Sequence, residues 1–254
     1  MSNQRLALPE IGLQLYTIRD LFANGDVSSV LEAVATIGYK NVELAGLYGK
    51  KPQEIKAILD TFGLKAVSTH EALDHIENEL DAVVDRAKLF GYDLVGVPWL
   101  APEHRTQVGY TEIAARLGPA RERLAQAGIT LMWHNHDFEF EPLPSAELPE
   151  DLLLSSGAAA ELDVYWIEFA GLAALDVIKK YSGRLPVLHI KDMRSGEKKF
   201  TEVGEGVLPL ADVVREAPQH GVRYLIVEQD ANWTVSPLDS ARVGFKNLSK
   251  MQAG

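Results

Sequence analysis

Residues that could bind a metal follow apolar runs in the second half of the sequence. A histidine or an acidic residue closes each of these runs, in the order His134, His136, Asp163, His189 and Glu228. Imidazole nitrogens and carboxylate oxygens are common protein ligands of divalent metals. Because four separate segments supply such groups, the sequence predicts one divalent metal ion held by residues far apart in the chain, and therefore an enzyme.

The elements that would position these residues alternate along the whole chain. Apolar runs predict strands over residues 11–18, 40–44, 64–69, 94–98, 129–134, 159–163, 186–191 and 223–228. Helical spacing predicts helices over residues 27–37, 52–62, 73–90, 106–127, 148–155, 172–181, 210–220 and 237–251. Glycines end six of these helices: Gly38, Gly63, Gly91, Gly128, Gly183 and Gly221. Eight β/α units predict an α/β protein, a (β/α)8 TIM barrel that forms a single domain over residues 1–254.

The polar residues at the strand ends also share faces of their strands. His189 and Lys191 lie on one face of their predicted strand, because successive side chains of a strand alternate. The active site of a β/α barrel lies at the carboxyl ends of its strands. If these faces point into the barrel mouth, the converging residues are Gln14, Glu43, His70, His134, His136, Asp163, His189, Lys191 and Glu228.

Each of these residues alone has an ordinary structural explanation. An aspartate at a strand end is commonly the N-cap of the following helix, and Asp163 could cap the segment 164–169. Helix capping alone does not explain why polar or titratable residues end at least six of the eight predicted strands. The pattern therefore favours a functional site, to which Trp99 could add an apolar wall for a sugar ring.

The charge balance argues against a nucleic-acid partner. The chain has 25 basic and 36 acidic residues, a formal net charge of −11, and no stripe of Lys and Arg with interleaved aromatics. Neutralisation of phosphates dominates affinity for nucleic acids, so we expect a small polar substrate instead. The absence of cysteine excludes thiolate nucleophiles and cysteine-ligated zinc.

The sequence also predicts no association with a membrane. The N-terminal segment lacks a continuous apolar stretch of signal-peptide length, and no run approaches the length of a membrane span. We therefore expect a cytoplasmic protein. The helical faces of barrels commonly support dimers, so a homo-oligomer is compatible with the sequence.

Two of the predicted loops that follow strands are unusually long. They cover residues 135–147 and 192–208. Long loops in a compact domain are more often functional than accidental. The second loop contains Gly196, Gly204 and Gly206 and could be a mobile lid over the site.

Five segments resemble xylose isomerase-like barrels of the sugar phosphate isomerase/epimerase family. They are residues 133–140 (WHNHDFEF), 161–166 (ELDVYW), 187–193 (VLHIKDM), 202–206 (EVGEG) and 227–230 (VEQD). The resemblance covers essentially the whole chain. It implies a barrel that holds one divalent metal ion (Mn, Mg, Co or Zn) through Glu, Asp, His and Glu from four consecutive strands. Asp163, His189 and Glu228 match the last three of these ligands.

The first ligand position departs from the family pattern. His134 stands where the resemblance places the first glutamate, and Glu139 follows a few residues later. Either Glu139 folds back to the metal or an imidazole replaces the carboxylate. We predict a metal site of Glu139, Asp163, His189 and Glu228, with His134 as the alternative first ligand.

The resemblance implies a sugar isomerase or epimerase that acts on a ketose or keto-sugar. The reaction would remove a proton next to a carbonyl and form an enediolate whose charge the metal stabilises. The predicted catalytic residues are Glu228, Glu139 and His136 as candidate bases, and Lys191 as hydrogen-bond donor to the developing oxyanion. The predicted sugar-binding residues are Gln14, Glu43, His70, Trp99, His134 and Lys191.

Two alternative functions remain open from the sequence. The epimerases of the family use two metal-bound carboxylates as a proton-shuttling pair, so a histidine at the first position favours a dehydratase or lyase acting on keto-sugars, keto-glycosides or inososes. A non-catalytic sugar-binding barrel is the second alternative. The endonuclease branch of the same superfamily needs a basic DNA-binding face, which the acidic sequence lacks.

Overall fold

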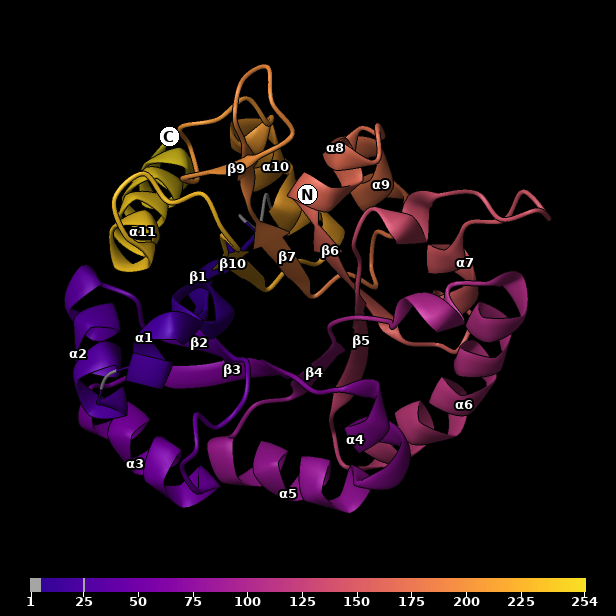
Figure 1. The fold of residues 1–254 in the computed structure, drawn as a ribbon, viewed down its shortest axis with the longest axis horizontal. Helices are drawn as coiled ribbons and strands as arrows, with labels where there is room; N and C mark the ends of the chain where they lie inside the picture. Colours follow the sequence, from indigo (N-terminus) through magenta and orange to yellow (C-terminus); the bar gives the residue numbers. More distant parts are fainter. Residues whose placement is uncertain (1–5, 25) are drawn as a thin grey trace, which may run out of the picture.

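Eight parallel strands close into a barrel in the computed structural model, which describes residues 6–24 and 26–254 (Figure 1). The strands neighbour one another in the order β1, β10, β7, β6, β5, β4, β3 and β2, and β2 pairs with β1. Their bounds are β1 Glu10–Gln14, β2 Asn41–Leu44, β3 Lys65–His70, β4 Leu94–Val97, β5 Thr130–His134, β6 Ala159–Asp163, β7 Val187–Ile190 and β10 Tyr224–Val227. The predicted (β/α)8 barrel is therefore confirmed. Residues 1–5 of the N-terminal segment lie outside the described residues.

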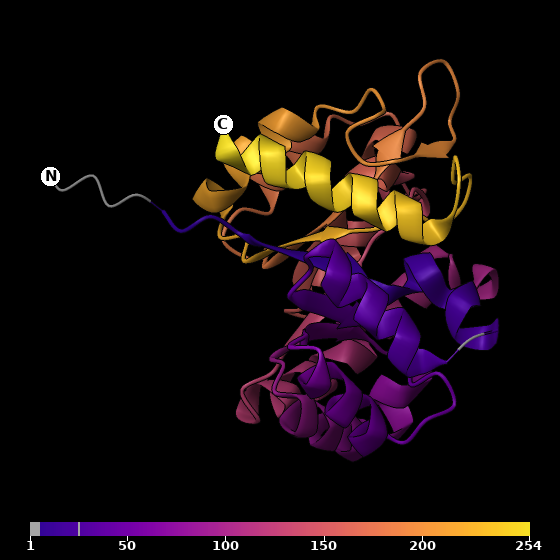
Figure 2. The same cartoon turned by 90° about the vertical axis from the view of Figure 1, so that its left-hand side faces the viewer.

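Helices surround the barrel (Figure 1). The α-helices are α1 Arg19–Asn24, α2 Val27–Ile37, α3 Pro52–Thr61, α4 Leu73–Asn78, α5 Leu80–Phe90, α6 Gln107–Gln126, α7 Pro149–Leu154, α8 Val164–Phe169, α9 Ala174–Lys180, α10 Leu210–Glu216 and α11 Pro237–Ala253. Short 3-10 helices are η1 Leu15–Ile18, η2 Pro102–His104, η3 Phe138–Phe140 and η4 Ala217–His220. The C-terminal helix α11 packs against α2, where the Tyr39 hydroxyl donates to the carbonyl of Ala241 at 2.8 Å (Figure 2). No helix among the described residues is long and apolar enough to cross a membrane.

Two predicted elements differ from the observed ones. The first strand ends at Gln14 rather than residue 18, because the Gln14 side chain accepts a hydrogen bond from the Tyr16 backbone and starts η1. The predicted helix 73–90 is divided into α4 and α5 at Glu79, whose backbone (φ −127°, ψ 30°) is not helical. Both differences arise from local backbone geometry and leave the order of the elements unchanged.

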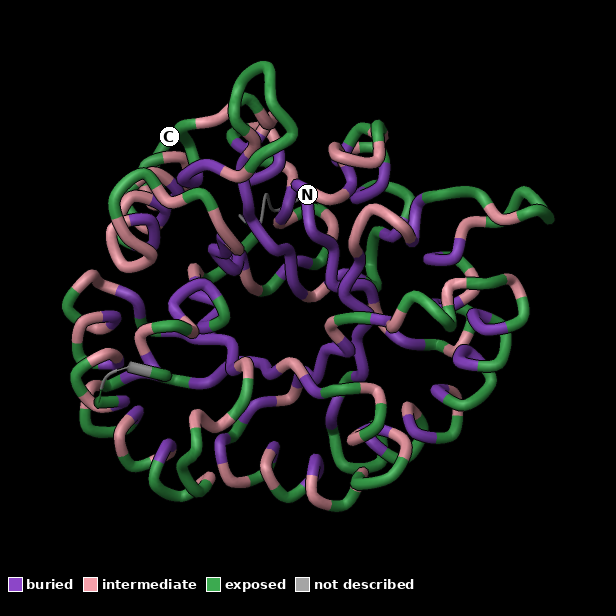
Figure 3. Tube along the Cα trace, in the orientation of Figure 1, coloured by how far each residue is buried: buried purple, intermediate pink, exposed green. Residues whose placement is uncertain are grey.

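Buried apolar side chains form one large layer and one smaller separate cluster. The larger layer lies between strands and helices, and Figure 3 shows the buried strands surrounded by helices whose outer faces are exposed. A smaller cluster includes one buried residue from each of five strands: Val67, Leu94, Met132, Val187 and Ile226. Val67, Met132, Val187 and Ile226 each precede a polar residue at the carboxyl end of their strand, so the apolar cluster lies next to the charged residues described below.

The long loop after β7 is organised around the carboxylate of Asp192. Strands β8 (Asp192–Met193) and β9 (Phe200–Thr201) pair antiparallel within it. The carboxylate accepts hydrogen bonds of 2.8–3.1 Å from the backbone N–H groups of Met193, Gly204, Gly206 and Leu208. One buried side chain thus joins the two ends of the loop.

Glu150 on α7 is fully buried, and neither of its carboxylate oxygens has a hydrogen-bond partner. Burial, with the nearby Glu139 carboxyl, raises the pKa of Glu150 well above its usual range. A carboxyl group whose folded-state pKa is raised contributes stability below its unfolded pKa and loses that contribution as the pH rises. The folded state should therefore become less stable as the pH rises above the ordinary range of a carboxyl group because of this residue.

We expect Glu150→Met to stabilise the protein at neutral pH by about 1–3 kcal/mol, the cost of an unsatisfied buried polar group. The gain should grow as the pH rises and should be measured by thermal unfolding across that pH range. Glu141→Met, at an exposed position of the preceding loop, is the control. A stability gain that is the same at every pH, or a loss, would contradict the prediction.

Candidate metal centre and substrate cavity

Four side chains meet at the carboxyl ends of neighbouring strands. His134 ends β5, Asp163 ends β6, His189 lies in β7 and Glu228 follows β10. Each offers one donor atom, and these four atoms lie within 4.8 Å of one another. All four residues are buried, so this group, here called the four-residue cluster, is a candidate metal centre inside the barrel mouth.

Glu161 adds a second, overlapping group of possible ligands. Donor atoms of His70, His134, Glu161 and His189 also lie within 4.8 Å of one another. Glu161 shares a face of β6 with Asp163, because the two residues are two apart in a strand. This alternation was the signal that could have placed Glu161 among the predicted site residues, from which it was absent.

Carboxylates flank both nitrogens of the His189 ring. Its Nδ1 lies 2.7 Å from Glu228 Oε2, and its Nε2 lies 2.7 Å from Glu43 Oε1. Burial alone would lower the pKa of His189, but the surrounding Glu43, Glu161 and Glu228 raise it well above its usual range. The carboxylates therefore fix the orientation of the ring, and His189 would bind a metal ion only as the neutral imidazole, with release of a proton.

Lys191 supplies the fixed positive charge of the site. Its Nζ lies 3.0 Å from Asp163 Oδ2, 3.0 Å from Glu228 Oε2 and 2.9 Å from Asp230 Oδ2. Burial would lower the pKa of Lys191, but Asp163, Asp230 and Glu228 raise it well above its usual range. Burial likewise favours the neutral form of Glu228, yet Lys191 and His189 hold its pKa well below its usual range.

The balance of buried charge fits a divalent cation. Four carboxylates are buried here: Asp163 and Glu228 contact the ammonium group of Lys191, and Glu43 and Glu161 face His70 and His189. Burial and the neighbouring Glu161 raise the pKa of Glu43, and burial raises that of Asp163, so like charges are crowded. A bound cation would compensate such crowding.

His134 has the properties of a neutral metal ligand. Burial, together with His189 and His70, lowers its pKa well below the usual range, so the imidazole keeps a free lone pair. Its Nδ1 is buried without a hydrogen-bond partner, as is Oε1 of Glu161. Buried polar atoms without partners are uncommon and often mark a site for an ion or water. The residues of the four-residue cluster therefore fit a divalent metal.

The structure does not bring Glu139, the predicted first ligand and candidate base, to this site. Its Oε2 accepts a hydrogen bond from the His136 backbone at 2.7 Å, and its Oε1 accepts one from Trp133 Nε1 at 3.2 Å. The 3-10 helix η3 turns the carboxyl group back toward Trp133, which faces away from its neighbour His134. Burial raises the pKa of Glu139 to about 8. His134 takes the position at the cluster instead.

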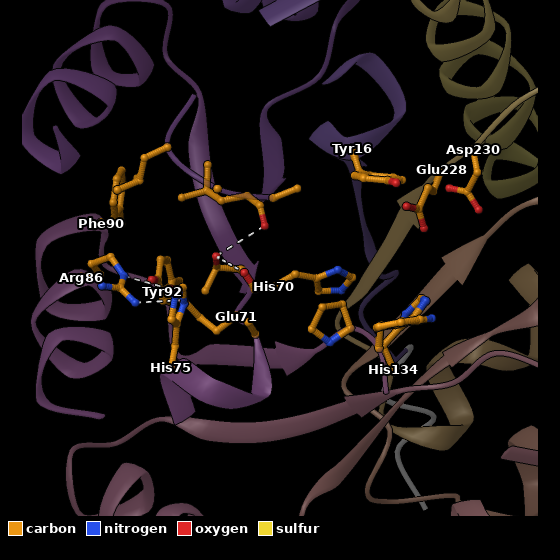
Figure 4. Close-up of a pocket in the computed structure, with 18 of the residues that line it drawn as sticks. Tyr16, His70, Glu71, His75, Arg86, Phe90, Tyr92, His134, Glu228 and Asp230 are labelled. Carbon is orange, nitrogen blue, oxygen red and sulfur yellow. Dashed lines mark hydrogen bonds and ion pairs between the residues drawn. The ribbon is translucent and has the colours of Figure 1, made fainter. Parts of the chain in front are cut away.

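A cavity of about 700 Å³ opens over the cluster. Six predicted site residues line it: His70, Trp99, His134, His136, Lys191 and Glu228. Figure 4 labels His70, His134 and Glu228 among them. Asp163 and His189 lie behind this wall. Tyr16 and Asp230 also line the cavity and were not among the predicted site residues, although Asp230 is two residues after Glu228 and has the same strand-end signal.

Gln14 and Glu43, predicted to contact the sugar, are fully buried and do not line the cavity. The Gln14 amide donates to Glu43 Oε1 at 2.6 Å, and Ser68 donates to Glu43 Oε2 at 2.5 Å. Glu43 in turn lies against His189. Gln14 and Glu43 therefore hold His189 in place and do not face the cavity. The prediction that they contact the substrate is wrong.

Gly96 leaves the space that Glu161 and His70 occupy. A Cβ atom at this position would lie 2.5 Å from Glu161 Oε2 and 3.1 Å from His70 Cδ2. We expect Gly96→Ala to displace these side chains and to lower catalytic activity by about 100-fold, because misplacements near 1 Å have such effects. Circular dichroism should show a retained fold.

Gly118→Ala is the matched control for Gly96→Ala. Nothing lies within 4 Å of a Cβ atom at Gly118, which is inside α6. This change should leave activity unaltered, and the gain in helix stability should be small because Pro119 follows and restricts the residue before it. Unchanged activity in Gly96→Ala would show that the site tolerates the displacement of Glu161.

Comparisons with known proteins place these features in context. The profile of the xylose isomerase-like TIM barrel family matches residues 31–250. Rhizopine catabolism protein MocC of Rhizobium meliloti is 23% identical over 286 residues, which cover 93% of this chain and 85% of MocC. A sugar phosphate isomerase/epimerase from Parabacteroides distasonis has a crystal structure with a TM-score of 0.81 at 21% identity, covering 100% of this chain and 96% of that one. The IolI protein, crystallised with a zinc atom, has a TM-score of 0.72 at 14% identity, covering 96% and 98%.

Proposed function

Because the chain belongs to the xylose isomerase-like TIM barrel family, we propose that it is a metal-dependent sugar isomerase or epimerase acting on a ketose or keto-sugar. The observation that carries this proposal is the four-residue cluster of His134, Asp163, His189 and Glu228, of which His134 and Glu228 line a cavity. The sugar phosphate isomerase/epimerase and zinc-containing relatives support it.

The cluster would hold one divalent ion, such as Mn, Mg, Co or Zn. When bound, such an ion supplies Lewis-acid stabilisation of negative charge at a substrate carbonyl oxygen. Removal of a proton from the neighbouring carbon creates that charge, and in water its formation is too costly. The remaining requirements are a base, a donor for the oxygen and a wall that orients the sugar, and residues of this chain provide each of them.

Glu228 is the best placed base. It lines the cavity, and its low pKa keeps it ionised at neutral pH, so it can accept a proton. Lys191 lines the same cavity and stays protonated, so its Nζ can donate a hydrogen bond to the oxygen on which charge develops. His136 also lines the cavity, and burial lowers its pKa to about 3, so it is unprotonated at neutral pH and is the alternative base.

The proposal is tested by proton exchange. The metal-loaded protein is incubated with a panel of keto-sugars in D2O, and deuterium incorporation next to the carbonyl is followed by NMR. We expect exchange with at least one sugar and a loss of about 10²–10⁴-fold in Glu228→Gln, the range for a general base. Glu205→Gln is the control, because Glu205 is exposed and bonds to Asn247 outside the cavity. A metal-loaded protein that binds sugars without any exchange is a binding barrel, not an isomerase.

A second candidate function, elimination, is favoured by His134. A neutral imidazole replaces a carboxylate at the first ligand position, so the two sides of the cluster are chemically unequal. A symmetric proton shuttle needs two similar bases, whereas elimination needs one base and a leaving group. Product analysis separates the two reactions, because isomerisation and epimerisation conserve the mass of the sugar and elimination lowers it by the mass of water or an alcohol.

A further inference from the structure

A second group of possible metal ligands lies beside the four-residue cluster, and the proposed function does not use it. The inner group, defined here as His70, His134 and Glu161, comes from the ends of β3 and β5 and from the middle of β6. His70 Nε2 lies 2.8 Å from Glu161 Oε2, and His134 Nδ1 lies 3.7 Å from the same oxygen. Two imidazole nitrogens and one carboxylate oxygen therefore converge on one point.

His134 stands between the two groups and presents a different ring nitrogen to each of them. Its Nε2 lies 3.9 Å from Asp163 Oδ2 in the four-residue cluster, and its Nδ1 lies toward Glu161 in the inner group. His134 is only 3% exposed, and its Nδ1 has no hydrogen-bond partner among the described residues. A buried polar atom without a partner is uncommon and often marks a site for an ion or water. The inner group therefore contains a donor atom that no protein group satisfies.

The carboxylates on the inner side of the site have no lysine or arginine partner. Glu43 and Glu161 are fully buried, and in the part of the chain that the structure describes they form ion pairs with histidines alone. Lys191 forms its ion pairs with the three other carboxylates of the site, those of Asp163, Glu228 and Asp230. One divalent ion in the four-residue cluster, together with Lys191, would balance those three charges. The charges of Glu43 and Glu161 would remain, and a second divalent ion would balance them.

The inner group is accessible from the cavity through its two histidines. His70 and His134 line the cavity and lie next to each other on its wall, with ring centroids 5.0 Å apart (Figure 4). Imidazole ligands suit first-row transition metals such as zinc and iron, whereas magnesium prefers oxygen ligands. An ion that enters the inner group from the cavity should therefore be a transition metal.

We propose that the inner group binds a second divalent transition-metal ion, and that His134 bridges the two ions through its two ring nitrogens. The bridging ring would be an imidazolate, and its last ring proton would leave to solvent. The second ion must also displace the hydrogen bond between His70 and Glu161, so we expect it to bind more weakly than the ion of the four-residue cluster. This inference rests on the proposed function only in taking that cluster as the first metal site.

The test counts the ions that the full-length protein binds. The protein is dialysed against increasing concentrations of Co²⁺ in buffer without chelator, and bound cobalt is measured by elemental analysis. We expect about two bound ions per chain at saturation in the wild type, and about one in Glu161→Gln and in His70→Gln. The ion that these variants retain shows that the four-residue cluster is still folded.

His220→Gln is the matched control for the loss of a histidine. His220 lies in η4, where its Nδ1 is 3.0 Å from Ser182 Oγ, outside both groups of ligands. This variant should bind as many ions as the wild type. A single ion in the saturated wild type, or a second ion that Glu161→Gln still binds, would overturn the proposal. Either result leaves the first ion in place, so it differs from a failure of the proposed function, in which metal or proton exchange is absent.

A second measurement tests whether His134 joins the two ions. Two Cu²⁺ ions that share an imidazolate couple magnetically, and this coupling weakens their EPR signal at low temperature. We expect the signal per bound Cu²⁺ to fall when the second equivalent binds to the wild type, and to stay constant in Glu161→Gln. A signal that grows in proportion to bound copper in the wild type would overturn the bridging position of His134.

Discussion

Replacement of His134 by alanine is expected to lower metal affinity and catalytic activity by more than about 100-fold. Loss of a residue that merely orients a metal ligand lowers metal affinity or activity by about 10- to 100-fold, so loss of a ligand itself should lower them further. Glu139→Gln is expected to retain the metal, because both Glu139 oxygens accept hydrogen bonds from Trp133 and His136 outside the cluster. Metal content of each variant, measured after purification without chelator, checks both expectations.

Two further variants make this result specific. Asp163→Asn should lose the metal as His134→Ala does, because Asp163 belongs to the same four-residue cluster. His134→Glu restores a carboxylate at the first position and should retain metal. If His134→Ala keeps its metal while Glu139→Gln loses it, the cluster must rearrange on binding, and the first ligand is Glu139 after all.

Replacement of Lys191 by methionine is expected to destabilise the metal-free protein by about 3–5 kcal/mol, the usual result of removing one partner from a buried ion pair. Asp163 and Glu228 would lose the ammonium group 3.0 Å from each. A divalent ion would replace the missing charge, so added metal should raise the melting temperature more in this variant than in the wild type. Activity should still fall, because the donor for the substrate oxygen is absent.

Lys180→Met is the matched control for this experiment. Lys180 pairs with Asp151 at 2.6 Å, but both side chains are more than 40% exposed. An exposed ion pair of this kind contributes about 0–1 kcal/mol. If both lysine variants lose equal stability in thermal unfolding, or if metal fails to rescue Lys191→Met, the ammonium group does not balance the charge of the cluster.

The fold could be predicted from the sequence because two periodicities repeat along it. Strands such as β5 and β7 end within a few residues of their predicted ends, since apolar runs are long enough to be recognised and a glycine ends the preceding helix. Asp163, His189 and Glu228 followed from their places at strand ends. Their convergence is a consequence of the barrel itself, which brings all carboxyl ends to one mouth.

The position of Glu139 could not be predicted in the same way. It lies in η3, outside the strand, where side-chain direction depends on local hydrogen bonds rather than on alternation. Its two N–H donors, from Trp133 and His136, become neighbours only after η3 has formed. Distance along the sequence therefore said nothing about whether the carboxyl group reaches the metal.

The depth of each side chain within the barrel also could not be predicted from the sequence. Alternation predicts which side chains point inward, but Gln14 and Glu43 lie beneath the cavity while His70 borders it. The register between β2 and β3 shifts between Val42 and Glu43, which alters the relative height of these residues.

The carboxylate of Asp192 has a consequence for how the loop after β7 moves. It accepts the amide hydrogens of Met193, Gly204, Gly206 and Leu208, and so holds both ends of the segment. Amide protons held in this way leave only when the segment opens, so they should exchange with solvent far more slowly than an ordinary loop permits. Ligand binding should leave these exchange rates nearly unchanged. The ordering entropy of the loop would then be lost during folding and not on each binding event.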